Sequence, residues 1–358
     1  MLATRTQPIH ITAPALPVAR VFHQIRATDA DRTSLQRDLE LSQAGVTRHV
    51  SALIDAGLVE ETRTTPEASA RSGRPRTKLG LDGRHLTAWG AHIGLRSTDI
   101  TVCDVAGRVI RHERLDHNVQ AVSAESTLNH VSERLSALGT GLPDPLNVGM
   151  AFSAHVSTDG HLTSTDYGWS NVDIAAHLPF PATLGTGVAA MAGTEIINAP
   201  LGTDSTQSTL YFYAREVVAH SWIFHGAVHR PHTGRTSTTF GNANTLKDAS
   251  RRGLTATTFT ELVALARTNP IARDVLNDRA RHLATSVTAA VDIVDPDAVV
   301  FAGEAFTLDP ETLKIVVSHL RSATGSQLRI QRADENILRT AAIQVALHPI
   351  RQYPLKFV

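Results

Sequence analysis

The chain lacks several features that would by themselves assign it to a class. It has a single cysteine, Cys103, so no internal disulfide can form and a reducing cytosol suits it. Its formal net charge is zero, so any affinity for DNA must come from a local patch rather than from an overall field. No apolar run approaches the ~20 residues that span a bilayer, and no signal peptide is recognisable at the N-terminus. We therefore expect a cytoplasmic protein with no membrane partner.

What is present begins with the stretch Leu35–Glu61, which predicts a helix-turn-helix followed by the first strand of a wing. Leu35 and Leu39 are four residues apart and would share one face of a short helix. Glu40 stands at the turn position usually taken by glycine, where a left-handed conformation would cost about 1 kcal/mol. Ser42 is a good N-cap for the next helix, because its hydroxyl can accept a bond from an unpaired backbone N–H.

The second helix of this pair has one apolar stripe with an i, i+4, i+7, i+8 spacing, which is formed by Val46, Val50, Leu53 and Ile54. Gly57 is expected to close the helix as a C-cap. Leu58 and Val59 then begin an extended segment. The spacing thus predicts a helix that buries one face and leaves the other exposed.

The outer face of this helix carries short or hydrogen-bonding side chains and no acid. In a major groove, arginine can fork onto a guanine edge, glutamine can bind adenine, and the methyl groups of alanine or threonine can contact thymine. An ordinary helical hairpin on a solvated surface is the alternative, but the short turn, the serine cap and the acid-free face together favour DNA binding. The residues predicted to contact DNA are Ser42, Gln43, Ala44, Thr47, Arg48, His49 and Ser51.

An extended cationic segment follows the expected tip of the wing. Residues 71–78 hold four cations and no acid, which we call the basic segment: Arg71, Arg74, Arg76 and Lys78. Such a segment can lie in a narrow minor groove or along phosphates. It can also be a solvated interdomain linker, but beside a helix-turn-helix we favour contact with DNA.

The rest of the chain divides into two predicted domains. Apolar residues at helical spacing between 18 and 25 predict the first helix of a three-helix unit, so residues 1–83 form a winged helix-turn-helix domain with a basic linker. Residues 84–358 form the second domain. Its predicted β-hairpin joins 88–105 to 108–114 through a two-residue turn. Buried strands are expected at 148–153 and 298–303, further strands at 209–213 and 219–224, and helices at 123–138, 188–198, 259–268, 271–293 and 311–322. This mixture predicts a two-lobed α/β domain.

The order of these features resembles the ROK family, which groups bacterial sugar-responsive repressors with sugar kinases. The resemblance covers nearly the whole chain and is strongest at the helix-turn-helix, at Gly73-Arg74-Pro75 and at the hairpin 90–110. It continues through 148–151, 167–169 and 295–303. The resemblance implies an α/β fold, a winged helix on a two-lobed, actin-like or hexokinase-like ATPase domain. The N-terminal helix-turn-helix is similar to that of the repressors, since the kinases of the family lack one.

The residues that carry the chemistry of that family are mostly absent here. His92 stands at the aspartate of the first phosphate loop, and Gly187 stands at the general base, where glycine cannot take a proton from a sugar hydroxyl. The second phosphate loop matches 214–219, which contains no glycine to let the backbone approach a phosphate. The zinc module of the family needs closely spaced cysteines, and residues 226–253 have none. We therefore expect no cofactor, no metal and no kinase activity.

Three local signals leave alternatives open. Gly185-Thr186-Gly187 is a lone Gly-x-Gly and indicates phosphate binding only weakly. Three histidines, at 225, 229 and 232, could bind a metal, but they have no cysteine or acidic partner nearby and fit a polar loop better. Trp169 could cover a ligand in the cleft between the lobes or could be ordinary core. The residues that we predict for an effector cleft are Trp169, Asn171, Glu195 and His225.

The sequence therefore predicts a DNA-binding transcriptional regulator, a repressor with a catalytically dead, sugar-kinase-like effector domain. Its expected partners are double-stranded DNA with an inverted-repeat operator, a sugar or sugar derivative as effector, and a second copy of the chain in a homodimer. Two alternatives stay open. One is a regulator that binds DNA without any effector, and the other is a sugar kinase with an added DNA-binding domain.

Overall fold

The computed structural model describes residues 6–63, 77–82, 85–201, 208–215, 217–231, 245–324, 328–333 and 336–357. The chain separates into two compact units, the first formed by Met1–Ser205 with Leu338–Val358 and the second by Thr206–Ile337. The domain boundary predicted at residue 83 lies inside the first unit and stays a prediction. No helix in the described ranges is both long enough and apolar enough to cross a membrane.

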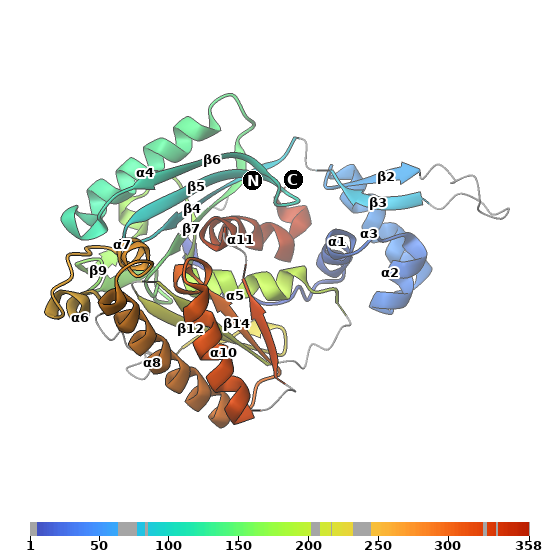
Figure 1. Ribbon diagram of the computed structural model, residues 1–358. Helices are drawn as coiled ribbons and strands as arrows, with labels where there is room; N and C mark the ends of the chain where they lie inside the picture. The colour runs from blue at the N-terminus through green and yellow to red at the C-terminus, as the bar shows by residue number, and fades with distance from the viewer. Residues whose placement is uncertain are drawn as a thin grey trace. The chain divides into compact units, whose positions relative to one another are not determined.

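The first unit begins with three helices and a two-stranded antiparallel wing (Figure 1). These elements are α1 Pro17–Ala27, α2 Arg32–Leu39, α3 Gln43–Asp55, β2 Val59–Arg63 and β3 Thr77–Leu81. Their shared core buries Phe22, Leu35, Val50 and Leu53 completely. The apolar spacing read from the sequence therefore predicted both helices of the pair and the helix before them. The predicted wing tip, residues 62–70, falls mostly outside the described residues.

The turn between α2 and α3 has the geometry that the sequence required. Glu40 adopts the left-handed conformation, with φ 55 and ψ 36. The Ser42 hydroxyl accepts a hydrogen bond from the Gly45 N–H at 3.1 Å and caps α3, as predicted. The C-terminal cap differs by one residue, because Ala56 is the cap and Gly57 follows it at φ +67. Gly57 thus supplies the left-handed residue that commonly follows a helix end.

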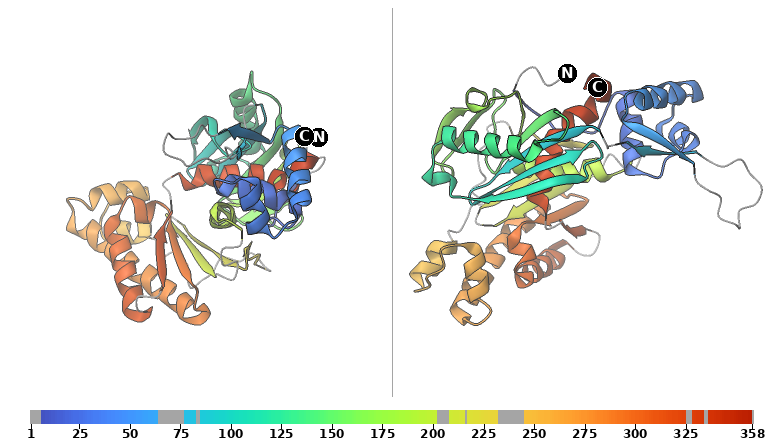
Figure 2. Two further views of the ribbon diagram at one scale, coloured as in Figure 1. Left: turned by 90° about the vertical axis from the view of Figure 1, so that its right-hand side faces the viewer. Right: turned by 90° about the horizontal axis from the view of Figure 1, so that it is seen from above.

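A six-stranded sheet forms the body of the first unit, in the order β1-β10-β7-β4-β5-β6. The strands are β1 Gln7–Pro8, β4 Thr87–Ile93, β5 Ser97–Asp104, β6 Val109–Asp116, β7 Pro145–Phe152 and β10 Thr183–Thr186. Helix α4 Ala124–Gly139 covers one face and α11 Ile337–Gln352 the other (Figures 1 and 2). Alternation along β4 shows this directly, because Trp89 contacts Gly139 of α4 while Gly90 lies against the Ala342 backbone of α11. Helix α5 Gly187–Asn198, the 3-10 helices η1 Val119–Ala121, η2 Ala175–His177 and η3 Pro354–Lys356, and the hairpin of β8 His161–Ser164 with β9 Trp169–Asp173 complete the unit.

One predicted strand is two in the structure. Residues 88–105 were expected to form a single arm of a hairpin, but β4 ends at Ile93 and β5 starts at Ser97, with the Gly94 N–H donating to the Ser97 carbonyl at 2.9 Å. The sequence did not show this turn because Leu95, within it, is apolar and packs against the core. The hairpin between β5 and β6 is present, but its predicted two-residue turn at Ala106-Gly107 is wrong. Residues 105–108 connect the strands, and the Gly107 N–H donates to the Asp104 carbonyl at 2.9 Å, which puts Val105 and Ala106 at the centre of the turn.

The second unit repeats the strand arrangement of the first. Its sheet has the order β13-β12-β11-β14-β15, with β11 to β13 antiparallel and β14 and β15 parallel to β11, as β7 and β10 are to β4. The strands are β11 Thr209–Ala214, β12 Val218–Phe224, β13 Ala227–Val228, β14 Ala298–Ala302 and β15 Arg329–Arg332. Three helices lie between β13 and β14 in the chain: α6 Thr245–Arg251, α7 Phe259–Leu265 and α8 Pro270–Val294. Two more, α9 Glu304–Thr307 and α10 Pro310–Thr324, lie between β14 and β15 (Figure 2). The two units therefore have similar α/β architectures, which agrees with the two-lobed α/β domain expected from the sequence.

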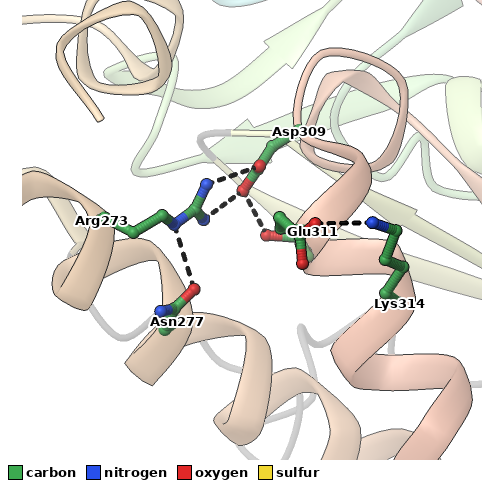
Figure 3. Close-up of polar contacts among 6 residues, drawn as sticks. Arg273, Asn277, Asp309, Glu311 and Lys314 are labelled. Atoms are coloured by element: carbon green, nitrogen blue, oxygen red, sulfur yellow. Dashed lines mark hydrogen bonds and ion pairs between the residues drawn. The ribbon is translucent and has the colours of Figure 1, made fainter. Parts of the chain in front are cut away.

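A half-buried ion pair in the second unit joins Arg273 of α8 to Asp309, the residue before α10 (Figure 3). Arg273 donates to both carboxylate oxygens of Asp309, at 2.8 and 2.6 Å, and its Nε donates to Asn277 at 3.0 Å. The Thr312 hydroxyl donates to the same carboxylate at 2.7 Å. Burial raises the pKa of Asp309, but the hydrogen bonds from Arg273 and Thr312 outweigh it and hold that pKa below its usual value.

Candidate nucleic-acid interface and effector region

The outer face of α3 presents the side chains that the sequence predicted for DNA contact. Every one of them is exposed except His49, which is half-buried. The helix has no acid in its first turn. Its exposed side chains are Gln43, Ala44, Thr47, Arg48 and Ser51, preceded by the cap Ser42.

The charges on the exposed face of α3 favour binding of a polyanion such as DNA. Within the described ranges Arg48 has no ion-pair partner, so its guanidinium is available to a base edge or a phosphate. Burial, and then the charge of Arg48, lowers the pKa of His49. The imidazole of His49 is therefore neutral at pH 7, and it can accept a hydrogen bond as well as donate one.

Other cations of the helix-turn-helix are already engaged. Arg32 pairs with Glu61 of the wing and Arg37 pairs with Asp38. Lys78 pairs with Asp29, which lies in the loop before α2 and 49 positions away in the sequence. A phosphate contact by Lys78 must therefore compete with this pair. The other three members of the basic segment, Arg71, Arg74 and Arg76, lie outside the described residues.

Helix α1 is fixed to the body of the first unit by two hydrogen bonds. The His23 Nε2 donates to the Ala199 carbonyl at 2.8 Å, just past the end of α5, and the Leu201 N–H donates to the Gln24 side chain at 3.0 Å. The core of the helix-turn-helix also continues into Val105 and Leu146 of the body. Sequence reasoning missed this junction, because its partners lie more than 100 residues apart along the chain.

The position matched to the catalytic base of the kinases, Gly187 at the start of α5, lies against His92 of β4. His92 is completely buried, and its Nε2 lies 3.4 Å from the Ser153 hydroxyl. A Cβ added at Gly187 would lie 2.7 Å from the same Nε2 and 3.0 Å from the Phe152 carbonyl oxygen. The two departures from the family pattern are therefore linked in space: the imidazole occupies the room that a side chain at 187 would need.

The segment matched to the second phosphate loop is a short connection between β11 and β12. The Arg215 N–H donates to the Val217 carbonyl at 2.9 Å, and the Arg215 side chain pairs with Glu304 at 3.0 Å. The Arg279 guanidinium donates to the Arg215 carbonyl. The backbone N–H and carbonyl of Arg215 are thus committed to neighbouring protein groups, which agrees with the lack of glycine that the sequence showed.

The residues predicted for an effector cleft are distributed over both units. Trp169 is 5% exposed and packs edge-on against Tyr167, with ring centroids 5.0 Å apart, so its ring is a core side chain in this structure. Asn171 is exposed, with φ 50, and Glu195 is half-buried on α5. His225, in the second unit, is an exposed residue of the turn between β12 and β13, where both it and Gly226 have positive φ. Such a turn explains His225 without a ligand, and the effector role of these four residues stays a prediction.

The histidines considered for a metal site are only partly described. His225 and His229 are both exposed near β13, whereas His232 lies outside the described residues. In the ranges that the structure covers, no three His, Cys, Asp or Glu side chains come together as metal ligands would.

The fold is the one that ROK transcriptional regulators and ROK sugar kinases share, as the sequence resemblance predicted. No family model matches the chain. A ROK family transcriptional regulator that is a homolog of the Escherichia coli MLC protein superposes with a TM-score of 0.70 at 17% identity, covering 95% of this chain and 98% of that one. A ROK family glucokinase from Streptomyces griseus superposes with a TM-score of 0.59 at 13% identity, covering 73% of this chain and 98% of the kinase.

Among sequence relatives, the transcriptional regulators Rv0485 of Mycobacterium tuberculosis and Mb0495 of Mycobacterium bovis are each 29% identical over 358 residues. Each alignment covers 86% of this chain and 78% of the relative. The structural match to the MLC homolog extends over nearly the whole chain, whereas the structural match to the Streptomyces griseus glucokinase leaves about a quarter of the chain uncovered.

Proposed function

We propose that this chain is a sequence-specific DNA-binding transcriptional regulator, acting as a repressor, with an effector domain that has lost phosphoryl transfer. The observation that carries the proposal is the acid-free, exposed face of α3, presented by a helix with a serine cap and a buried apolar stripe. Such a face is what a recognition helix needs to enter a major groove. The relatives named as transcriptional regulators support it.

The loss of kinase chemistry rests on the packing around Gly187. Phosphoryl transfer needs a positioned base and a cradle for the phosphates. Here the base position is glycine, the adjacent space holds the His92 ring, and the segment matched to the second phosphate loop is tied down by protein groups. We infer that the body of the protein binds and signals without turning over ATP.

The regulator is proposed to act as a homodimer on an inverted repeat, because two-fold symmetry of the protein imposes two-fold half-sites. Its effector is proposed to be a sugar or sugar derivative. An effector can change DNA binding only through a difference in its affinity for two arrangements of the protein. The hydrogen bonds of His23 and Gln24 to the body give such a difference a route to α1.

The experiment that tests the proposal is the change Arg48→Ala in the full-length protein. We expect a loss of about 1–3 kcal/mol on a cognate site and a relaxed preference at one base pair in each half-site. The cognate site is found by selection from random duplexes, and binding is measured by titration at fixed salt. Arg281→Ala is the matched control, because Arg281 is an exposed arginine of α8 that should not affect binding. Specific binding that survives Arg48→Ala together with Thr47→Ala would contradict the placement of α3.

A further inference from the structure

Strand β6 forms one margin of the six-stranded sheet, and in the described part of the chain it has a neighbouring strand on one side only (Figure 1). Every residue of the strand is exposed except Glu113 and Leu115, which are half-buried. Val109 and Ile110 are 42% and 43% exposed, although both are apolar. The open side of such a strand presents backbone N–H and C=O groups to which another strand can bind. We call the open side of residues 109–116 the β6 edge.

The pairing of β6 with β5 fixes which backbone groups point outward from the β6 edge. The His117 N–H donates to the Arg96 carbonyl at 2.9 Å, so these two residues form a hydrogen-bonded pair. Hydrogen-bonded and non-hydrogen-bonded pairs alternate along an antiparallel ladder, so the pair of Thr101 with His112 is a non-hydrogen-bonded one. The backbone N–H and C=O of His112 therefore point away from β5. Neither group has a hydrogen-bond partner within the ranges that the structure covers.

The sequence of β6 is complementary to a second copy of itself in one register. A two-fold axis perpendicular to the sheet sets one residue opposite its own copy and sets the flanking residues opposite each other in reverse order. An axis at Arg111, Glu113 or Arg114 would place like charges directly opposite each other, which destabilises a sheet. An axis at His112 instead sets Arg111 of each copy opposite Glu113 of the other, so the pairing gains two facing pairs of opposite charge.

Contacts with α4 hold the two charged side chains of this register on one face of the sheet. Arg111 donates to the carbonyls of Leu138 and Thr140 at 2.8 Å each, and these uncharged acceptors leave its positive charge uncompensated. Glu113 pairs with Arg134 of α4 at 2.6 Å. A carboxylate has room for more than one donor, so it can accept a second cation. In the paired arrangement each Glu113 would lie between Arg134 of its own chain and Arg111 of the second copy.

We propose that two copies of the chain associate by antiparallel pairing of their β6 edges, with His112 of each copy at the two-fold axis. The pairing joins the two six-stranded sheets into one continuous sheet and sets the exposed side chain of Val109 opposite Leu115 of the second copy. Because both copies use the same edge, the association closes at a dimer. This inference rests on the homodimer of the proposed function and assigns the surface that forms it.

The first test is disulfide crosslinking of the full-length protein. Cys103 is the one native cysteine and is buried, so an introduced surface cysteine can react alone. In His112→Cys the two Cα atoms would be about 5.5 Å apart, which is within the range of a disulfide, and oxidation should convert most of the protein to a covalent dimer. Asp116→Cys is the matched control. Asp116 is exposed on the same strand, but its two copies would lie about 27 Å apart and should not crosslink.

The second test reverses the facing charges and measures self-association by analytical ultracentrifugation. Arg111→Glu and Glu113→Arg should each weaken the dimer about tenfold or more, because each sets two pairs of like charges opposite each other. An equimolar mixture of the two variants should regain the association, since every facing pair in the mixed dimer again has opposite charges. A variant that failed to fold would not be rescued in this way. Asp274→Arg, at an exposed position of α8, is the control and should associate like the wild type.

Two results would overturn the proposed surface and leave the homodimer in place. One is a wild-type dimer by light scattering whose His112→Cys variant crosslinks no more than Asp116→Cys. The other is a mixture of the two charge-reversal variants that does not associate. A wild-type protein that is monomeric at micromolar concentration would instead refute the homodimer of the proposed function together with this surface. Specific DNA binding is tested separately by Arg48→Ala and does not depend on which surface joins the two copies.

Discussion

Replacing Gly187 with alanine should destabilise the protein, because the new Cβ has no room. It would lie 2.7 Å from His92 Nε2 and 3.0 Å from the Phe152 carbonyl oxygen, and the first distance is shorter than real Cβ contacts. Neither neighbour can yield easily, since His92 is completely buried and the other contact is backbone. Overpacking of this kind costs about 1–3 kcal/mol. The reduced freedom of the unfolded chain offsets about 0.4–1 kcal/mol, so the net cost should be about 1–2 kcal/mol.

The assay is urea denaturation of the full-length protein, with Gly80→Ala as the control. Nothing lies within 4 Å of a Cβ added at Gly80, so that change should fall within about 0.5 kcal/mol of the wild type. A double-mutant cycle with His92→Ala isolates the clash, and the coupling between the two sites should be about 1–2 kcal/mol. If Gly187→Ala is as stable as the wild type, the imidazole does not fill this space.

The same geometry predicts the result of restoring the acid of the kinases. Gly187→Asp should be at least as destabilising as Gly187→Ala, and it should show no ATP turnover with hexoses or amino sugars. Sugar-dependent release of ADP from the wild type would refute the proposed loss of kinase activity, whatever the stability of the variants.

Three further predictions concern stability and DNA binding. Glu40→Gly should raise the free energy of unfolding by at most about 1 kcal/mol in urea denaturation, because glycine adopts the left-handed conformation without steric cost but also adds freedom to the unfolded chain. Arg273→Met should lower it by about 2–3 kcal/mol by leaving the Asp309 carboxylate buried and short of partners. Because the folded pKa of Asp309 is depressed, this contribution is present above the usual value of 3.8 and is lost as the pH falls through the folded pKa, so a stability profile from pH 6 to 2 should flatten in the variant. Alanine at all four positions of the basic segment should reduce the salt slope of DNA binding by about one unit for each phosphate that the variant no longer neutralises, and an unchanged slope would leave only the linker interpretation.

The helix-turn-helix was predictable from the sequence because the forces that shape it are local. The cap at Ser42, the apolar spacing of α3 and the strained turn at Glu40 each involve residues within one or two helical turns of one another. An exposed face follows directly once the buried stripe is known. The exposed positions of Gln43 and Arg48 could therefore be predicted without any tertiary information.

Helices and strands that are buried on all sides have no clear pattern of apolar residues in the sequence and were harder to predict. Helix α11 was not predicted, since it is apolar around much of its circumference and contains Pro349, which usually ends a helix. Its path depends on Gly90 and Gly149 of the sheet, where an added Cβ would lie 2.6 Å from the Ala342 oxygen and 2.2 Å from the Ala346 nitrogen. Such close approach is a property of two elements together and leaves no periodic pattern in either.

The sequence by itself determined which residues the recognition helix exposes and which chemical groups of a kinase are missing. Only the tertiary structure decided what replaced them. His92 and Gly187 are far apart in the chain and become neighbours through the pairing of β4, β7 and β10. Helix α1 and the end of α5 are likewise far apart in the chain and are joined by the hydrogen bonds of His23 and Gln24. Local composition could not predict either contact, because each depends on which strand pairs with which and on where a buried side chain finds room.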